Sequence, residues 1–354
     1  MKHKGLLVIL SVITVSVCST VLVLKTRRNN ENVSPRNDVQ SSRTTASTVS
    51  APLDLPRLTN QAAVIVVGKV LDLSVAPQQE SQLGESYLAT IHVNRTLKGT
   101  VDKPNISVKL IKTPDRISLA KSMTPSLYAL FFLNQESPKG FSLTDKDVQA
   151  VVASEGSSIS SRSVLDRVVN EVAHVLVSPN NSTQDQLQAV AALSSVDSPA
   201  ANEALHQAVA SKDVNVKLEA EVGLLKHNDL SVLDQVERTL MKSRPDISDN
   251  GVLRLSSGIR DGVRDPKAVP ILGRLLSSSN PRVRLAAAHA LRETRSDAGI
   301  RPLSAALNDS DQMVRYDAVL GLSEITGDLT HAPSVDLFKR DENKYLTYWR
   351  ERAR

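Results

Sequence analysis

The sequence has few aromatic residues, few glycines and one cysteine, and each shortage excludes a class of protein. Phe, Tyr and Trp make up 3% of 354 residues, with 14 glycines, which argues against aromatic stacking platforms and glycine-cradled nucleotide sites. The single cysteine, Cys18, excludes an intramolecular disulfide and a cysteine-based structural zinc site. No P-loop, dinucleotide fingerprint, nucleophile elbow or HExxH motif occurs, and the seven histidines never pair at metal-binding spacing. We therefore expect a protein that is not an enzyme and has no catalytic residue, cofactor, metal or small-molecule substrate.

The net positive charge of the chain is confined to the N-terminus. The formal net charge is +5, but residues 1–58 hold eight Lys and Arg against three Asp and Glu, and the remainder holds 35 of each. The folded part therefore lacks the basic field that is typical of nucleic-acid binders, and we expect no nucleic-acid partner.

The N-terminus has the pattern of a membrane anchor followed by a tether. Residues 5–24 contain no charge, and a helix of that length, at about 1.5 Å per residue, spans the roughly 30 Å hydrocarbon core of a bilayer. We expect residues 1–28 to be a transmembrane anchor with basic flanks, which predicts a single-pass membrane protein. A cleaved signal peptide and a lipidated Cys18 are alternatives. Residues 29–57 are rich in Ser, Thr and Asn, which predicts a disordered linker.

The orientation in the membrane depends on which signal is followed. A count of the basic flanking residues favours the cytoplasmic side for the bulk of the chain. A short basic tail, an apolar run and a Ser/Thr-rich tether are, however, the usual start of exported bacterial proteins. By that analogy we expect the soluble domains to be extracytoplasmic.

Residues 58–153 have the two-residue periodicity of β-strands. The runs VIVVGKV, YLATIHVNRTLKG, NISVKLIK, SLYALFFL and GFSLTDK are separated by Gly, Pro or Asn. Five such strands predict a small β-barrel. Through VIVVGKV and HVNRTLKG the segment resembles the OB-type barrels of the netrin and metalloproteinase-inhibitor kind, a resemblance that implies a fold but no activity. Five of the ten aromatic residues lie here, and they form either a ligand face or the barrel core.

Residues 162–330 repeat themselves at helical spacing. At an offset of 31, NPRVRLAAAHAL aligns with SDQMVRYDAVLGL. We expect about five helix pairs, at 163–195, 199–226, 230–262, 266–294 and 297–326. Asn280 is expected to cap the helix that Pro281 begins. Such pairs contact only their neighbours and stack into an α-solenoid.

The repeats resemble the HEAT-repeat family, in the variety found in the phycobilin lyase subunits. VPILGRLL and IRPLSAAL match its first helices, SNPRVR and DSDQMVR its links, and LAAAHAL and YDAVLGL its second helices. The resemblance implies an armadillo-like solenoid that binds partner proteins. The lyase variety implies an alternative, a subunit that assists an enzyme.

Residues 331–354 contain four aromatic residues at the spacing of one helical face. Because the last repeat of a solenoid needs its open edge covered, we expect a C-terminal capping helix. A partner-binding helix is the alternative.

Residues 252–301 contain ten Lys and Arg against four Asp and Glu. This cluster either binds an anionic ligand, such as an acidic peptide, a phosphate or nucleic acid, or consists of solvated and repeat-stabilising side chains, with Arg284 and Arg315 bonded to neighbouring carbonyls or aspartates. The candidate binding residues are Arg254, Arg274, Arg282, His289, Arg292 and Tyr316. The sequence thus predicts an N-terminal transmembrane helix, an OB-like β-barrel and a HEAT-type α-solenoid, acting as a membrane-anchored scaffold for a partner protein.

Overall fold

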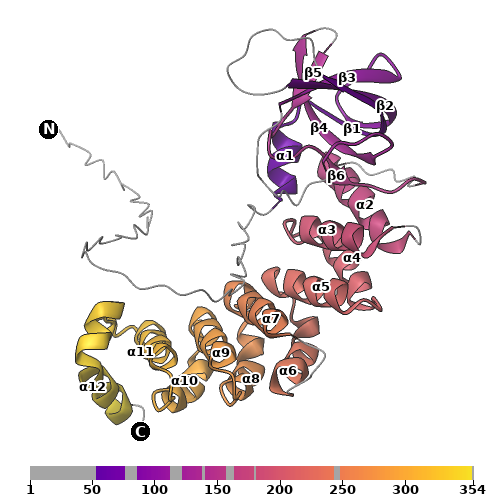
Figure 1. The fold of residues 1–354 in the computed structure, drawn as a ribbon. Helices are drawn as coiled ribbons and strands as arrows, with labels where there is room; N and C mark the ends of the chain where they lie inside the picture. The colour runs from indigo at the N-terminus through magenta and orange to yellow at the C-terminus, as the bar shows by residue number, and fades with distance from the viewer. Residues whose placement is uncertain are drawn as a thin grey trace, which may run out of the picture. The chain divides into compact units, whose positions relative to one another are not determined.

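The computed structural model describes residues 53–75, 86–111, 122–137, 140–156, 163–178, 181–242 and 248–352. By its internal contacts the chain divides into two units, residues 1–47 and 48–354, and all described residues belong to the second. Within that unit a β domain is followed by a series of helices (Figure 1).

The β domain consists of a short helix and six strands. They are α1 (Leu55–Gln61), β1 (Val64–Val75), β2 (Ser86–Lys98), β3 (Asn105–Ile111), β4 (Tyr128–Ser137), β5 (Gly140–Leu143) and β6 (Val151–Val152). The sheet order is β1-β2-β3-β5-β4-β6, and β1 also pairs with β4. Because β1 is bonded on both edges, the first five strands close into a barrel, with β3 and β5 parallel. This is the small barrel that the sequence predicts.

Both faces of β1 and β4 are buried, which explains their unbroken apolar runs. Val66 and Phe131 belong to the barrel interior. Ile65, Val67 and Phe132 belong instead to the core that the barrel shares with the helices. The strand aromatics Phe131 and Phe132 are therefore core residues and do not form a ligand face.

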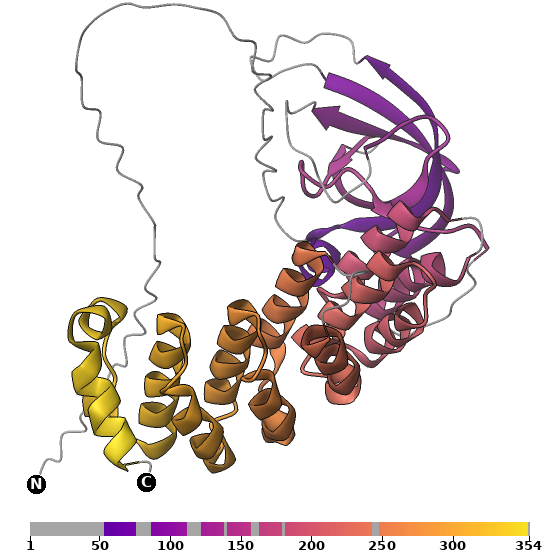
Figure 2. The same ribbon diagram turned by 60° about the horizontal axis from the view of Figure 1, so that its bottom comes forward.

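The helices that follow form successive pairs. These are α2 (Val164–Val177) with α3 (Thr183–Leu193), α4 (Pro199–Val209) with α5 (Val214–Lys226), α6 (Leu233–Met241) with α7 (Asp249–Gly262), α8 (Val269–Leu275) with α9 (Pro281–Glu293), and α10 (Ile300–Ala306) with α11 (Gln312–Thr326). Single 3-10 turns lie before α6, α8, α10 and α12, namely η1 (Leu230–Val232), η2 (Pro266–Ala268), η3 (Asp297–Gly299) and η4 (Leu329–His331). The second helices of the pairs, α3, α5, α7, α9 and α11, pack side by side, and we call them the B helices (Figure 2).

Each B helix begins at a capping side chain that accepts a backbone N–H of the first turn. The caps are Ser182, Asp213, Ser248, Asn280 and Asp311. Asn280 is followed by Pro281, as the sequence predicts. Because all five caps are known, equivalent positions can be counted from them in every B helix.

Small and branched side chains alternate in the core between the B helices. Seven residues after the cap stand Ala189, Ala220, Leu255, Ala287 and Ala318, and eleven residues after it stand Leu193, Leu224, Ile259, Leu291 and Leu322. All ten are at most 1% exposed. At the end of α7 the approach is closer still, since a Cβ on Gly262 would lie 1.9 Å from the backbone oxygen of Leu225. Only glycine fits this contact.

Both ends of the helical series are covered. At one end, Arg95 of β2 binds Glu171 of α2 at 2.7 Å, and the Leu55 N–H donates to the Ser195 hydroxyl at 3.2 Å. At the other, the aromatic face of α12 (Val335–Arg352) packs on α11, with Trp349 only 1% exposed. Phe338, Tyr345 and Trp349 therefore lie in the core, and Tyr348 is half-buried beside them.

The structure contradicts two predictions, that of a transmembrane helix and that of a single-pass membrane protein with extracytoplasmic domains. Within residues 53–352, as far as they are described, no helix is long and apolar enough to cross a membrane. Apolar residues in these helices recur every three or four positions, so each helix keeps a polar face. The predicted segment 5–24 and its flanks lie outside the described residues. The fold class is therefore corrected to a β-barrel followed by helical repeats.

Candidate functional site

Two of the six candidate residues, Arg254 and Arg274, form ion pairs with the preceding repeat. Arg254 of α7 pairs with Glu219 of α5, whose side chain is 10% exposed. Arg274 of α8 makes two bonds to Glu237 of α6, at 2.5 and 2.7 Å. Burial raises the pKa of Glu219 although Arg254 opposes it, whereas the bond from Arg274 lowers the pKa of Glu237.

Two further candidates, His289 and Arg292, lie together on α9 and face the same carboxylate. Asp317 of α11 is 3.7 Å from His289 Nδ1 and 3.6 Å from an Arg292 guanidinium nitrogen. Arg292 also donates to Glu324 at 2.8 Å. These side chains join neighbouring repeats, so their charge is largely neutralised within the protein.

The remaining two candidates differ in their surroundings. The Tyr316 hydroxyl donates to the Pro333 carbonyl at 3.3 Å, its ring lies 5.3 Å from Phe338, and burial raises its pKa. Arg282 is exposed, and its guanidinium has no partner among the described side chains. The six residues therefore spread over three helix pairs.

Arg284 and Arg315 occupy the fourth position after the cap in α9 and α11 and have the same role. Arg284 donates to both oxygens of Asp309, at 2.7 and 2.9 Å, and to the Ser278 and Ser279 carbonyls. Arg315 donates to Glu342 at 2.6 Å, and to the Asp309 and Ser310 carbonyls. These contacts show that both arginines bond to neighbouring carbonyls and carboxylates, as the repeat-stabilising interpretation predicts.

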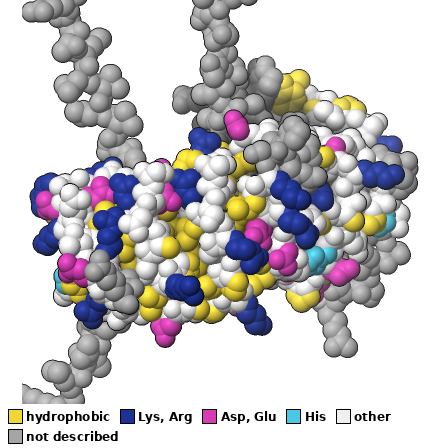
Figure 3. All heavy atoms as spheres, turned by 90° about the horizontal axis from the view of Figure 1, so that it is seen from below, with side chains coloured by type: hydrophobic (Ala, Val, Ile, Leu, Met, Phe, Trp, Pro, Cys, Tyr) yellow, Lys and Arg dark blue, Asp and Glu magenta, His cyan; other side chains and the backbone are white. Residues whose placement is uncertain are grey.

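On the face that Figure 3 shows, the charges of the described residues do not gather into a field of one sign. Figure 3 shows Lys and Arg interspersed with Asp and Glu and with hydrophobic side chains on the face seen from below. The arginine-rich segment 252–301 thus gives no separate cationic patch on that face.

A different set of residues stands out once positions are counted from the helix caps. Five residues after its cap, every B helix carries a large apolar side chain. This position-five row is Leu187, Leu218, Leu253, Leu285 and Tyr316. Leu253, at its centre, is 44% exposed, and Leu218 is 8% exposed. The row can be found in the sequence, because each of its members follows a Ser, Asp or Asn cap at a fixed distance. The positions can be counted, however, only once the structure has shown which residues are the caps.

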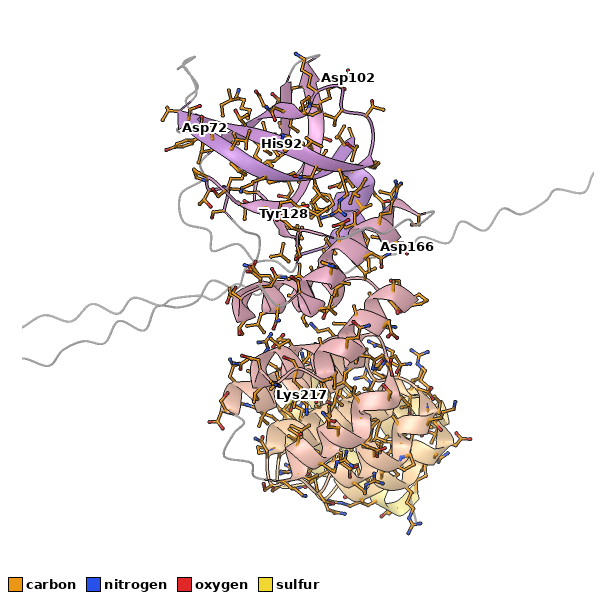
Figure 4. The ribbon with its side chains drawn as sticks, turned by 90° about the vertical axis from the view of Figure 1, so that its right-hand side faces the viewer. Asp72, His92, Asp102, Tyr128, Asp166 and Lys217 are labelled. Carbon is orange, nitrogen blue, oxygen red and sulfur yellow. The ribbon has the colours of Figure 1, made fainter. Side chains whose placement is uncertain are left out.

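A hollow of ≈ 460 Å³ lies where the β domain meets α2 and α3. Its lining includes Tyr128, Ser154, Glu155, Asn181 and Asp185 and no basic side chain. Burial raises the pKa of Tyr128. Figure 4 shows Tyr128 on the side of the β domain that faces the helices.

Among the described residues on the outer face of the β domain, the acidic and histidine side chains do not converge. His92 Nδ1 is bonded to Asn105 at 2.8 Å across β2 and β3. Asp72, His92 and Asp102 lie apart from one another (Figure 4). In the part of the chain that the structure covers, no three His, Cys, Asp or Glu residues could hold a metal ion.

Comparison with known proteins identifies the repeats. Residues 253–323, which run from α7 to α11, match the family model of HEAT repeats. No curated protein matches the chain. Among solved structures, human deoxyhypusine hydroxylase in complex with glycerol is 17% identical, with 53% of this chain and 74% of that chain covered and a TM-score of 0.25, a likeness that carries no functional argument. Residues 253–323 are therefore HEAT repeats.

Proposed function

We propose that this protein is a non-enzymatic scaffold that binds a partner protein across the outer face of its B helices. HEAT repeats generally mediate protein interactions, because stacked helices expose one extended surface. The observation that carries the proposal is the position-five row.

The row is unlike the core positions beside it. Positions seven and eleven are buried in every B helix. In the row, by contrast, Leu253 is 44% exposed and Leu187, Leu285 and Tyr316 are half-buried, and only Leu218, at 8% exposed, is buried. Burying a leucine side chain contributes about 1.5–3 kcal/mol. A partner that covers these side chains therefore gains affinity from surface that is now in water.

The absence of a catalytic role is part of the same proposal. It is supported by the lack of nucleotide, hydrolase and metal motifs in the sequence. A partner protein, and not a substrate, is the expected ligand.

The test is affinity capture with the full chain as bait. The binding variant is Leu253→Glu with Leu285→Glu, and the matched control is Leu329→Glu, which changes a 64% exposed leucine on η4 outside the row. We expect one partner to be captured by wild type and by the control, and lost with the binding variant. Capture that survives in the binding variant, or that is lost equally in the control, contradicts the proposal.

A further inference from the structure

We infer that the B-helix face binds an extended, polyproline-II-like segment with an apolar residue at every third position. The inference rests on the proposed function and specifies the ligand of that same surface. It follows from the side chains one turn before the position-five row, from the spacing of the helices and from the pairing of charges.

The first argument is a second row of equivalent residues. Two residues after the cap stand Gln184, Asn215 and Asn250, in α3, α5 and α7. All three are exposed, and none of their side-chain amides is hydrogen-bonded within the described part of the chain. Positions two and five lie side by side on a helix surface because they are three residues apart. In α3 and α7 the amide stands next to an accessible leucine, whereas in α5 the neighbouring Leu218 is only 8% exposed.

In α9 the same pair is Arg282 and Leu285, so the donor is a guanidinium. In α11 it is Met313 and Tyr316, which are both largely apolar. The alternation of polar and apolar rows therefore covers four neighbouring helices and ends at α11.

The second argument is geometric. Axes of packed helices lie about 8–10 Å apart, so leucines at equivalent positions recur at that spacing. A polyproline-II segment has three residues per turn and rises about 9 Å per turn, so every third side chain points the same way at a matching distance. In a β-strand the third residue lies at a similar distance but points to the opposite face.

The third argument separates this ligand from an α-helix. A polyproline-II segment has no internal backbone hydrogen bonds, so its N–H and C=O groups are open to side-chain amides. An α-helix bonds these groups internally, so its backbone is closed to the row of Gln184, Asn215 and Asn250. The amide row therefore favours an extended chain, which offers backbone groups as well as side chains.

The fourth argument is charge. Three cations on this face are paired with acids of the protein itself, Arg254 with Glu219, Arg260 with Asp261, and Arg292 with Glu324. Arg282 is exposed and has no partner among the described side chains. A surface on which most charges are paired complements a largely uncharged segment, and binding to it changes little with salt. This is opposite to what a cationic site for acidic peptides or nucleic acid requires.

The experiment measures binding of fluorescently labelled synthetic peptides to the full chain by anisotropy. One peptide carries leucine at every third position, with proline and serine between. Two others of equal length carry the same number of leucines, at every second or at every seventh position, and the last has alanine in place of proline so that it can form an α-helix. We expect the three-residue peptide to bind most tightly and with the same affinity at low and high salt. Leu253→Ser should weaken it about tenfold, the loss of one buried leucine. Asn250→Ala should weaken it less, and Leu329→Ser should leave it unchanged.

Preferential binding of the seven-residue peptide would show a helical ligand and overturn the inference, as would binding that high salt abolishes. Failure of all three peptides also overturns it. If capture of a partner still depends on Leu253 and Leu285 in that case, the proposed function stands and only the extended ligand is wrong. All three variants, Leu253→Ser, Asn250→Ala and Leu329→Ser, are checked for an unchanged thermal unfolding profile.

Discussion

Replacing Arg284 by glutamine tests whether the arginines of the repeats are structural. Arg284 and Asp309 have side chains that are only 12% and 8% exposed, and they are joined by two bonds of 2.7 and 2.9 Å. The substitution leaves the Asp309 carboxylate buried without its cation, and it leaves the Ser278 and Ser279 carbonyls without their donor.

The expected loss follows from burial. Removing one partner of a buried ion pair costs 3–5 kcal/mol, and we expect about 3 because both side chains keep some contact with water. The double variant Arg284→Gln with Asp309→Asn should recover part of this loss, since it removes the unpaired charge.

The assay is urea unfolding followed by circular dichroism. Arg282→Gln is the control, since Arg282 lies on the same helix but is exposed and has no partner among the described side chains. We expect a clear drop in the unfolding midpoint for Arg284→Gln and none for Arg282→Gln. Equal midpoints for the two variants would refute the structural role of the buried pair.

Three further outcomes are expected. Trp349→Ala, which empties a site that is 1% exposed, should cost about 3–5 kcal/mol in thermal or urea unfolding, and a loss under 1 would contradict the capping role of α12. Gly262→Ala places a Cβ 1.9 Å from a backbone oxygen and should destabilise strongly, whereas Gly273→Ala, with 3.5 Å to its nearest neighbour, should not; similar melting temperatures for both would refute the close contact. Hydrogen bonds from arginine lower the pKa of Glu342 and, against the effect of burial, the pKa of Asp309. These two carboxylates therefore stabilise the fold above their unfolded pKa values, which are about 4. This stabilisation is lost as the pH falls through their lower pKa values in the folded protein. Urea midpoints measured from pH 7 down to acid should therefore fall below about pH 4, and a flat profile would contradict this.

The repeated helices could be predicted because their determinants are local. The caps Asn280 and Asp311, and the alanines and leucines that follow them, recur at helical spacing, and each repeat contacts only its neighbours. The β-barrel was predictable as a set of strands, since period-two runs and turn residues are also local. Which strands meet to close the barrel was not predictable, because the pairing of β1 with β4 joins residues far apart in the sequence.

The surroundings of the candidate binding residues, in contrast, could not be predicted from the sequence. The segment 252–301 is basic as a sequence, but Glu219 and Glu237, which neutralise Arg254 and Arg274, come from an earlier repeat, and Glu324, which binds Arg292, from a later one. Net charge along a chain does not reveal which charges meet after folding.

The sequence alone determined the order of the modules and the positions of their core, because apolar periodicity and caps act within a helix or strand. Only the tertiary structure decided which arginines are occupied by partners and which leucines stay in contact with water. Both depend on neighbours about 30 residues away in the chain, which stacking brings within 3 Å for Arg292 and Glu324.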